Sequence, residues 1–167
     1  MTWPRERNFS WQEANDTESL CGFSLIELVV LLLVLAMLAA VGIPIYTGYK
    51  DNARNAKAAA DIAVLQFDLS FYASANNNSL PDSLDALGRG PILDPWGNAY
   101  QYLNYDQVAH GHGEQRKDRF LVPINSTYDL YSMGKDGKTK TPLTAQDSRD
   151  DIIRASDGLF IGLASDF

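Results

Sequence analysis

One carboxylate stands at the start of an apolar stretch that is long enough to cross a bilayer. Glu27 is followed by 22 uncharged residues, 28–49, and the run ends only at Lys50. About 20 apolar residues suffice for a spanning helix, and an ionised carboxylate inside lipid costs roughly 2.5–3.5 kcal/mol unless it is paired. Glu27 is therefore either an acid at the membrane interface with no particular role, or a functional group whose cationic partner has to be found.

The residues around Glu27 favour the functional interpretation. The chain reads Gly22-Phe23-Ser24-Leu25-Ile26-Glu27-Leu28 before the apolar run, which resembles the processing site of the type IV pilin and pseudopilin superfamily. The resemblance implies that a prepilin peptidase cleaves between Gly22 and Phe23 on the cytoplasmic side and methylates the new amino group of Phe23. It also implies that Glu27 pairs with the amino terminus of a neighbouring subunit, since neither charge can stay unpaired in lipid.

Pro44, late in the apolar run, matches the helix-kinking proline of the same superfamily. Proline lacks a backbone N–H, so it removes one helical hydrogen bond, and we expect it to unwind a turn there.

Two other interpretations of the amino terminus fit less well. A secretory signal peptide has a short apolar core followed by small residues; here the core is long and begins beside an acid, although Ala39-Ala40-Val41 leaves a cleavage site open. A lipoprotein anchored at Cys21 needs an apolar segment before the cysteine, where Asp16 and Glu18 stand instead. Cleavage after Gly22 would remove the single cysteine, so the mature chain would have no disulfide.

The leader, residues 1–22, departs from the basic leaders of the superfamily because two arginines stand against four acids. Basic residues follow the span instead, at Lys50, Arg54 and Lys57, and their count alone would place the wrong end in the cytoplasm. We give the cleavage motif more weight than the charge count. A start codon assigned too far upstream would explain the acidic leader.

Composition limits the remaining possibilities. The chain has 167 residues and a net charge of −7, which allows one modest domain after the helix and argues against nucleic acid as a partner. A membrane-anchored periplasmic enzyme would have little to catalyse with, because the mature chain has no cysteine and no serine in a nucleophile elbow. His110 and His112 share a polar loop and are a minor alternative as metal ligands.

The helical pattern continues from 50 to 75, beyond the membrane. Two adjacent apolar stripes recur at spacings of three and four, which predicts a helix lying across a sheet with both stripes in the core. The first stripe is Ala53, Ala56, Ala60, Ala63, Val64, Phe67 and Phe71, and the second is Ile62, Leu65, Leu69 and Tyr72. The small alanines would let the sheet or another subunit approach closely. Three asparagines at 76–78 are expected to end the helix.

The carboxy-terminal half shows turn and strand signals. A short helical turn is expected from Pro81, ending at Gly88 or Gly90, and 94–98 is a turn anchored by Trp96. Strands are expected at 100–105, 120–124 and 128–133, the last running into an Asp-Gly turn.

Two of these segments sharpen the resemblance. Asp94-Pro95-Trp96-Gly97-Asn98 and residues 128–137 are similar to segments of the major pseudopilin of type II secretion systems. That resemblance implies a calcium ion held by the carbonyl of Met133, the carboxylate of Asp136, and Asp150 or Asp151, an oxygen set that suits a hard cation. The threonines and lysines after Gly137 depart from the family, and a solvated acidic loop is the alternative.

The resemblance covers 22–75, 94–105 and 128–137, and implies an α+β, pilin-like fold in which a long amino-terminal helix packs on a small antiparallel sheet. We expect a leader (1–22), a transmembrane and assembly helix (23–49), an amphipathic continuation (50–75) and a periplasmic globular part (76–167). Residues 153–167 have no assigned role.

The implied function is that of a structural subunit of a type II secretion pseudopilus, not an enzyme. It would be a single-pass inner-membrane protein that polymerises with itself. Its partners would be the prepilin peptidase, minor pseudopilins and the inner-membrane assembly platform. A type IV pilin or minor pilin for adhesion, motility or DNA uptake is the alternative.

Overall fold

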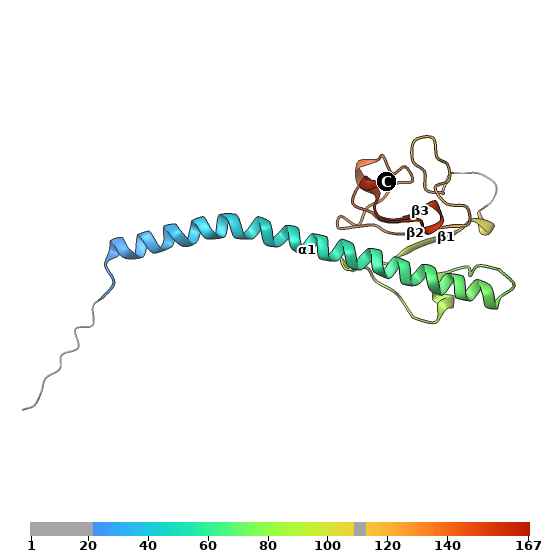
Figure 1. Ribbon diagram of the computed structural model, residues 1–167, viewed down its shortest axis with the longest axis horizontal. Coiled ribbons are helices and arrows are strands. Elements are labelled where there is room, and N and C mark those ends of the chain that lie inside the picture. The colour runs from blue at the N-terminus through green and yellow to red at the C-terminus, as the bar shows by residue number, and fades with distance from the viewer. Residues whose placement is uncertain (1–21, 109–112) are drawn as a thin grey trace, which may run out of the picture. The chain divides into compact units, whose positions relative to one another are not determined.

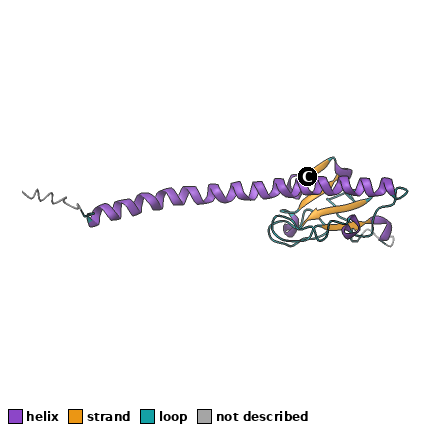
Figure 2. Ribbon diagram, turned by 90° about the horizontal axis from the view of Figure 1, so that it is seen from below, coloured by secondary structure: helices purple, strands orange, loops and turns teal. Residues whose placement is uncertain are grey.

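The computed structural model describes residues 22–108 and 113–167. It contains one long helix, α1 (Leu25–Ala75), and one four-stranded antiparallel sheet (Figures 1 and 2). The chain divides into two compact units, one up to Ile43 and one from Pro44 to Phe167, and the sheet belongs entirely to the second. The predicted α+β, pilin-like fold is confirmed.

Helix α1 ends where the sequence predicts. Asn77 and Asn78 have φ angles of 54° and 66°, a left-handed conformation that asparagine tolerates better than most residues. The Asn78 N–H donates to the carbonyl of Ala73 at 2.8 Å, and the Asn76 amide donates to the carbonyl of Tyr72 at 2.9 Å. These bonds satisfy carbonyls at the helix end that have no partner within the helix.

Helix α1 runs through Pro44 without a break. The expectation that Pro44 unwinds a turn is therefore wrong. Proline removes only its own N–H, and the surrounding side chains are exposed, so neighbouring turns adjust without a clash against packed groups. The Thr47 hydroxyl donates to the Pro44 carbonyl at 2.9 Å, which uses one of the oxygens near the proline.

The four strands follow the chain in spatial order. They are β1 (Gln101–Asn104), β2 (Tyr128–Ser132), β3 (Ile152–Ala155) and β4 (Phe160–Leu163), and each pairs antiparallel with the next. Two predicted strands, 100–105 and 128–133, are confirmed as β1 and β2. The predicted short helical turn is also confirmed, as a 3-10 turn at Leu84–Leu87 that is capped by Gly88 at φ 70°.

The third predicted strand, 120–124, is wrong. The segment instead makes a tight turn in which Asp118 and Leu121 exchange backbone hydrogen bonds. Pro123 follows at once, and a proline has no N–H to donate to a neighbouring strand. The β3–β4 hairpin was not predicted; its turn at 156–158 lies against α1, where a Cβ on Gly158 would stand 2.3 Å from the Gln66 side chain.

The sheet is covered on both faces. On one face, Ile62, Leu65 and Leu69 of α1 pack against Tyr100, Tyr128, Leu130 and Ile152. On the other face, Ile153 and Ala155 pack against Ile124, Leu143 and Ala164, which come from the loops opposite α1 (Figure 1). Successive strand residues point to opposite faces, so Ile152 and Ile153 belong to different cores.

Only one of the two predicted helical stripes lies in the core. Ile62, Leu65 and Leu69 are buried, whereas the whole stripe from Ala53 to Phe71 is exposed. Val64, Phe67 and Phe71 have exposed fractions of 46%, 71% and 68%. A helix offers only one face to a sheet, so the prediction that both stripes are core is wrong. The exposed stripe needs another explanation.

Candidate functional site

The predicted processing segment lies at an exposed start of the described chain. Gly22 has no atom within 4 Å of the position that a Cβ would take, and the Phe23 side chain is exposed. Helix α1 begins two residues later, at Leu25. The backbone between Gly22 and Phe23 is thus open to a protease, and cleavage there stays a prediction.

Glu27 lies in the first turn of α1. Its side chain is exposed, and within the described part of the chain it forms no ion pair. A carboxylate near a helix amino terminus is favoured by the helix dipole, but by only about 0.3–1 kcal/mol, less than the cost of leaving it unpaired in lipid. The pairing of Glu27 with an amino terminus stays a prediction.

The amino-terminal half of α1 has no polar face. Every described residue from 22 to 50 is exposed, and an 18-residue window of the helix reaches a mean hydropathy of 3.0. By length and composition, α1 is able to cross a membrane. Pro44 lies in this exposed stretch, where it contacts no buried group.

The second candidate site is the turn after β2. Gly134 and Gly137 have φ angles of 65° and 66°, and Asp136 lies between them. One carboxylate oxygen of Asp150, Oδ2, accepts the backbone N–H groups of Lys135 and Asp136, at 2.9 and 3.1 Å. Asp136 Oδ1 accepts the Lys138 N–H at 2.8 Å. The structure therefore brings Asp136 and Asp150 together, through the backbone of the turn.

The two carboxy-terminal segments that carry the resemblance touch one another at this turn. Asp94 accepts the N–H groups of Trp96 and Asn98, at 3.0 and 2.8 Å, and the Ser132 hydroxyl at 2.5 Å. The Asn98 amide donates to the Gly134 carbonyl at 3.2 Å. The 94–98 turn is thus hydrogen-bonded both to the end of β2 and to the 134–137 turn.

Gly134 is fixed by its surroundings as well as by its backbone angle. A Cβ there would stand 2.2 Å from the Asp150 carbonyl oxygen, closer than any side chain tolerates. The segment before β3 lies directly against the turn that follows Met133, whose carbonyl is one of the predicted ligands.

Asp151 faces a different environment from Asp150. It is fully buried, and its Oδ2 lies 2.5 Å from Arg116 Nη2 and accepts the Thr139 hydroxyl at 2.6 Å. Burial raises the pKa of the Asp151 carboxyl to about 6, although Arg116 and Thr139 work in the opposite direction. The counter-ion of Asp151 is an arginine of the same chain, and its other carboxylate oxygen, Oδ1, has no hydrogen-bond partner among the described residues.

As they lie, these residues do not fit a calcium ion as one set of ligands. No three His, Cys, Asp or Glu side chains gather around one point within the described residues. Asp150 Oδ2 is committed to two backbone donors, and Asp151 Oδ2 to Arg116 and Thr139. Calcium at this turn stays a prediction from the resemblance. The alternative metal ligands His110 and His112 lie outside the described residues.

The sequence pattern did not single out Arg116. It stands in a polar stretch with no periodicity, 35 residues before Asp151. The one available signal was its type: among basic residues, arginine is the one that pairs with carboxylates inside proteins. Nothing in the spacing would have selected it from the other arginines.

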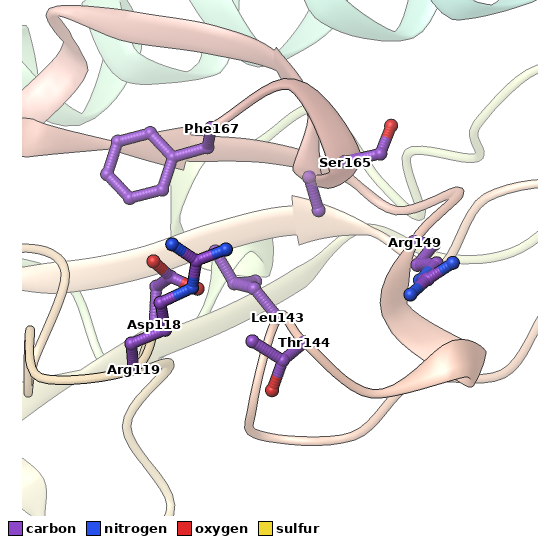
Figure 3. Close-up of a pocket in the computed structure, with 8 residues that line it drawn as sticks. Asp118, Arg119, Leu143, Thr144, Arg149, Ser165 and Phe167 are labelled. Atoms are coloured by element: carbon purple, nitrogen blue, oxygen red, sulfur yellow. The ribbon is translucent and has the colours of Figure 1, made fainter.

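A surface pocket of about 310 Å³ lies at the carboxy terminus (Figure 3). Arg119 and Arg149 line it together with Leu143, Thr144 and Phe167. Neither arginine forms an ion pair within the residues described. Asp118, Thr144 and Ser165 supply the side-chain oxygen atoms of its lining, which contains no histidine or cysteine.

Comparison with known proteins gives one consistent result. No family model and no solved structure matches the chain. The type II secretion system core protein G of Aeromonas hydrophila is 30% identical over 140 residues, which cover 72% of this chain and 86% of that protein. The core proteins G of Pectobacterium carotovorum subsp. carotovorum and Pseudomonas aeruginosa are both 31% identical, over 72% and 70% of this chain and 79% and 84% of their own lengths.

Proposed function

The chain belongs to the family of type II secretion system core protein G, the major pseudopilins, and from this premise we propose that it polymerises from the inner membrane into a pseudopilus. Growth of that filament would drive exported proteins through the outer membrane. The matched relatives all carry the secretion name, which favours this function over that of a type IV pilin.

The exposed stripe on α1 is the observation that carries the proposal. Large contiguous apolar surfaces on a folded chain mark interaction sites, and lipid accounts for the stretch up to Tyr49. Val64, Phe67 and Phe71 lie 15–22 residues further along the same helix, at 1.5 Å per residue roughly 22–33 Å beyond it. Lipid in the same bilayer does not reach them. A neighbouring subunit does, if helices pack side by side.

Assembly begins with processing in this account. Cleavage between Gly22 and Phe23 by a prepilin peptidase creates an amino group at the end of α1, and methylation keeps its charge. Glu27 of a neighbouring subunit then supplies the counter-ion. The pairing removes two uncompensated charges from lipid at once, so it favours subunits that stack in one register.

The other partners follow from the same premise. Subunits would be handed over by an inner-membrane assembly platform, and minor pseudopilins would join the filament. The segment after the span, including the whole sheet, would lie in the periplasm. The subunit itself would do no chemistry: the buried acids Asp94, Asp129 and Asp151 are all engaged with donors inside the fold.

Substitutions in the exposed stripe test the proposal. Phe67→Gln together with Phe71→Gln should leave the fold intact, because both side chains are exposed in the subunit, but should weaken filament formation and secretion. Phe120→Gln is the matched control, since Phe120 is fully exposed in the 118–121 turn, outside α1. The measurements are chemical crosslinking of subunits in membranes and the amount of protein exported. Wild-type crosslinking and export in the double variant would contradict the proposal.

A further inference from the structure

The buried pair of Arg116 and Asp151 joins three parts of the globular unit. Asp151 immediately precedes β3, Thr139 lies in the loop after the 134–137 turn, and Arg116 lies in the loop before β2. The Thr139 hydroxyl donates to Asp151 Oδ2 and accepts a hydrogen bond from Arg116 Nη1. One guanidinium therefore anchors both ends of the 139–151 segment.

Arg116 is itself held firmly. Its backbone N–H donates to Asp129 Oδ2 at 2.7 Å, its carbonyl accepts the Ile124 N–H at 3.1 Å, and its guanidinium lies over the Tyr131 ring at 4.2 Å. Asp129 is in turn bound by Tyr105 and Asn125. The backbone of Arg116 is thus fixed outside the loop, and its guanidinium lies between the Tyr131 ring of β2 and the two loop residues that accept its hydrogen bonds.

The charges of the loop are balanced by the chain's own cations. Residues 134–151 contain four acids, Asp136, Asp147, Asp150 and Asp151, and four basic residues, Lys135, Lys138, Lys140 and Arg149, for a net charge of zero. Lys135 Nζ pairs with Asp51 at 2.7 Å and Lys140 Nζ with Asp147 at 2.9 Å. Calcium affinity rises with the number of charged oxygen ligands, and in this loop the basic residues equal the acids in number.

We propose that Arg116 is the resident cation of the carboxy-terminal loop, so that residues 134–151 are held in place by a guanidinium and not by a divalent metal ion. A buried carboxylate has to be paired, and an arginine at hydrogen-bond distance does for Asp151 what a metal ion would otherwise do. The subunit thereby keeps its loop ordered whatever the calcium concentration around it.

Hydrogen exchange of the full chain in detergent micelles tests this proposal. The backbone amides of Lys135, Asp136 and Lys138 are bonded to the two carboxylates of the turn, so their exchange rates report directly on the loop. In the wild type, protection should be the same with millimolar calcium and with a chelator. Loop amides that exchange more than tenfold faster after chelation would overturn the proposal, because a metal would then be the cation.

Three variants separate charge pairing from simple packing. Arg116→Met keeps an apolar stem over Tyr131 and removes the charge, and it should raise loop exchange at least tenfold. Adding Asp151→Asn to Arg116→Met should restore part of the protection, because the buried charge is removed as well. If the second substitution adds damage instead, Arg116 acts only by packing and the proposal fails.

Arg149→Met is the matched control. Arg149 lies two residues from Asp151, lines the surface pocket and forms no ion pair with described residues, so its loss should leave exchange unchanged. The wild-type comparison of calcium and chelator still decides the matter if Arg116→Met fails to fold. The hydrogen-exchange experiment measures the order of the loop and not secretion. Failure of this inference therefore leaves the proposed function untouched.

Discussion

Glu27 and Asp151 are two carboxylates in opposite settings, one exposed on α1 and the other buried in the globular unit. Asp151 is buried in the globular unit and finds its cation, Arg116, in the same subunit. Glu27 lies on an exposed apolar helix and has no cation in the described part of the subunit. A buried charge with a partner in the same chain can be kept inside one subunit, whereas we propose that a charge left without one in an apolar segment pairs with a second molecule. The first pairing lies inside the subunit, and the second is proposed to take place in assembly.

Removal of the Glu27 charge should have the largest effect on function. Glu27→Leu lowers the cost of inserting α1 into lipid, so insertion and cleavage should proceed as in the wild type. Filament assembly should fail, because the amino group of Phe23 loses its counter-ion. Crosslinking of subunits in membranes measures the result, and wild-type crosslinking in the variant would contradict the pairing role.

Removal of the Arg116 charge should instead leave insertion unaffected and destabilise the globular unit. Breaking a buried ion pair by deleting one partner costs about 3–5 kcal/mol. Urea unfolding of Arg116→Met, followed by the tyrosine signal, should show a lower midpoint than Arg149→Met. Equal midpoints for these two variants would show that Asp151 does not depend on Arg116.

Two glycines with nearly the same backbone angle test how closely the 134–137 turn packs against the segment before β3. Gly134 and Gly90 have φ angles of 65° and 70°, and alanine in that conformation costs about 1–3 kcal/mol at either position. A Cβ at Gly134 also meets the Asp150 carbonyl, whereas one at Gly90 has nothing within 4 Å. Gly134→Ala should therefore destabilise the unit more than Gly90→Ala in thermal melts. Equal losses would mean that the 134–137 turn and the segment before β3 are not in close contact.

A change of pH should alter the stability of the globular unit less than these substitutions do. The direction of the change should distinguish a buried carboxylate from an exposed one. The pKa of Asp151 is raised from 3.8 to about 6, chiefly by burial, so the folded state holds this proton more tightly than the unfolded state. Its contribution to stability is greatest below pH 3.8 and is lost as the pH rises through about 6. Asp151→Asn cannot titrate, so the wild type should lose stability relative to this variant between pH 4 and 6.

Asp147 should behave in the opposite way. Its hydrogen bond with Lys140 lowers its pKa, so the stability that it contributes is lost as the pH falls through that lowered value. The effect should be small because the pair is exposed. Melting curves of wild type, Asp151→Asn and Asp147→Asn across pH 3–8 measure both slopes. Slopes of the same sign would contradict the assignment of a buried and an exposed acid.

Local chemistry was enough to predict the helix and part of the sheet. The asparagines at 76–78 end α1 through their own left-handed backbone angles and hydrogen bonds. The alternation of residue types was enough to predict β1 and β2. The β3–β4 hairpin was missed because β3 is buried on both faces and contains Arg154, so it has no alternating pattern. The exposed stripe was assigned to the core because periodicity shows that a face is apolar, but not what covers it.

The candidate site divides in the same way. Glu27 and its processing motif are contiguous, so the sequence alone is enough to propose them, and their roles stay predictions. Asp136 and Asp150 were placed together by resemblance, and the structure does bring them to one turn. The pairing of Arg116 with Asp151 depends on three loops that lie close together in the fold. No spacing of residues in the sequence indicates that these loops are in contact.

Mass spectrometry of the mature chain tests the central claim most directly. The proposed partner of Glu27 is an amino group that exists only after cleavage between Gly22 and Phe23. Protein extracted from membranes should begin at Phe23 and carry one methyl group on its amino nitrogen. A chain that begins at Met1, or after Ala40, would contradict the account.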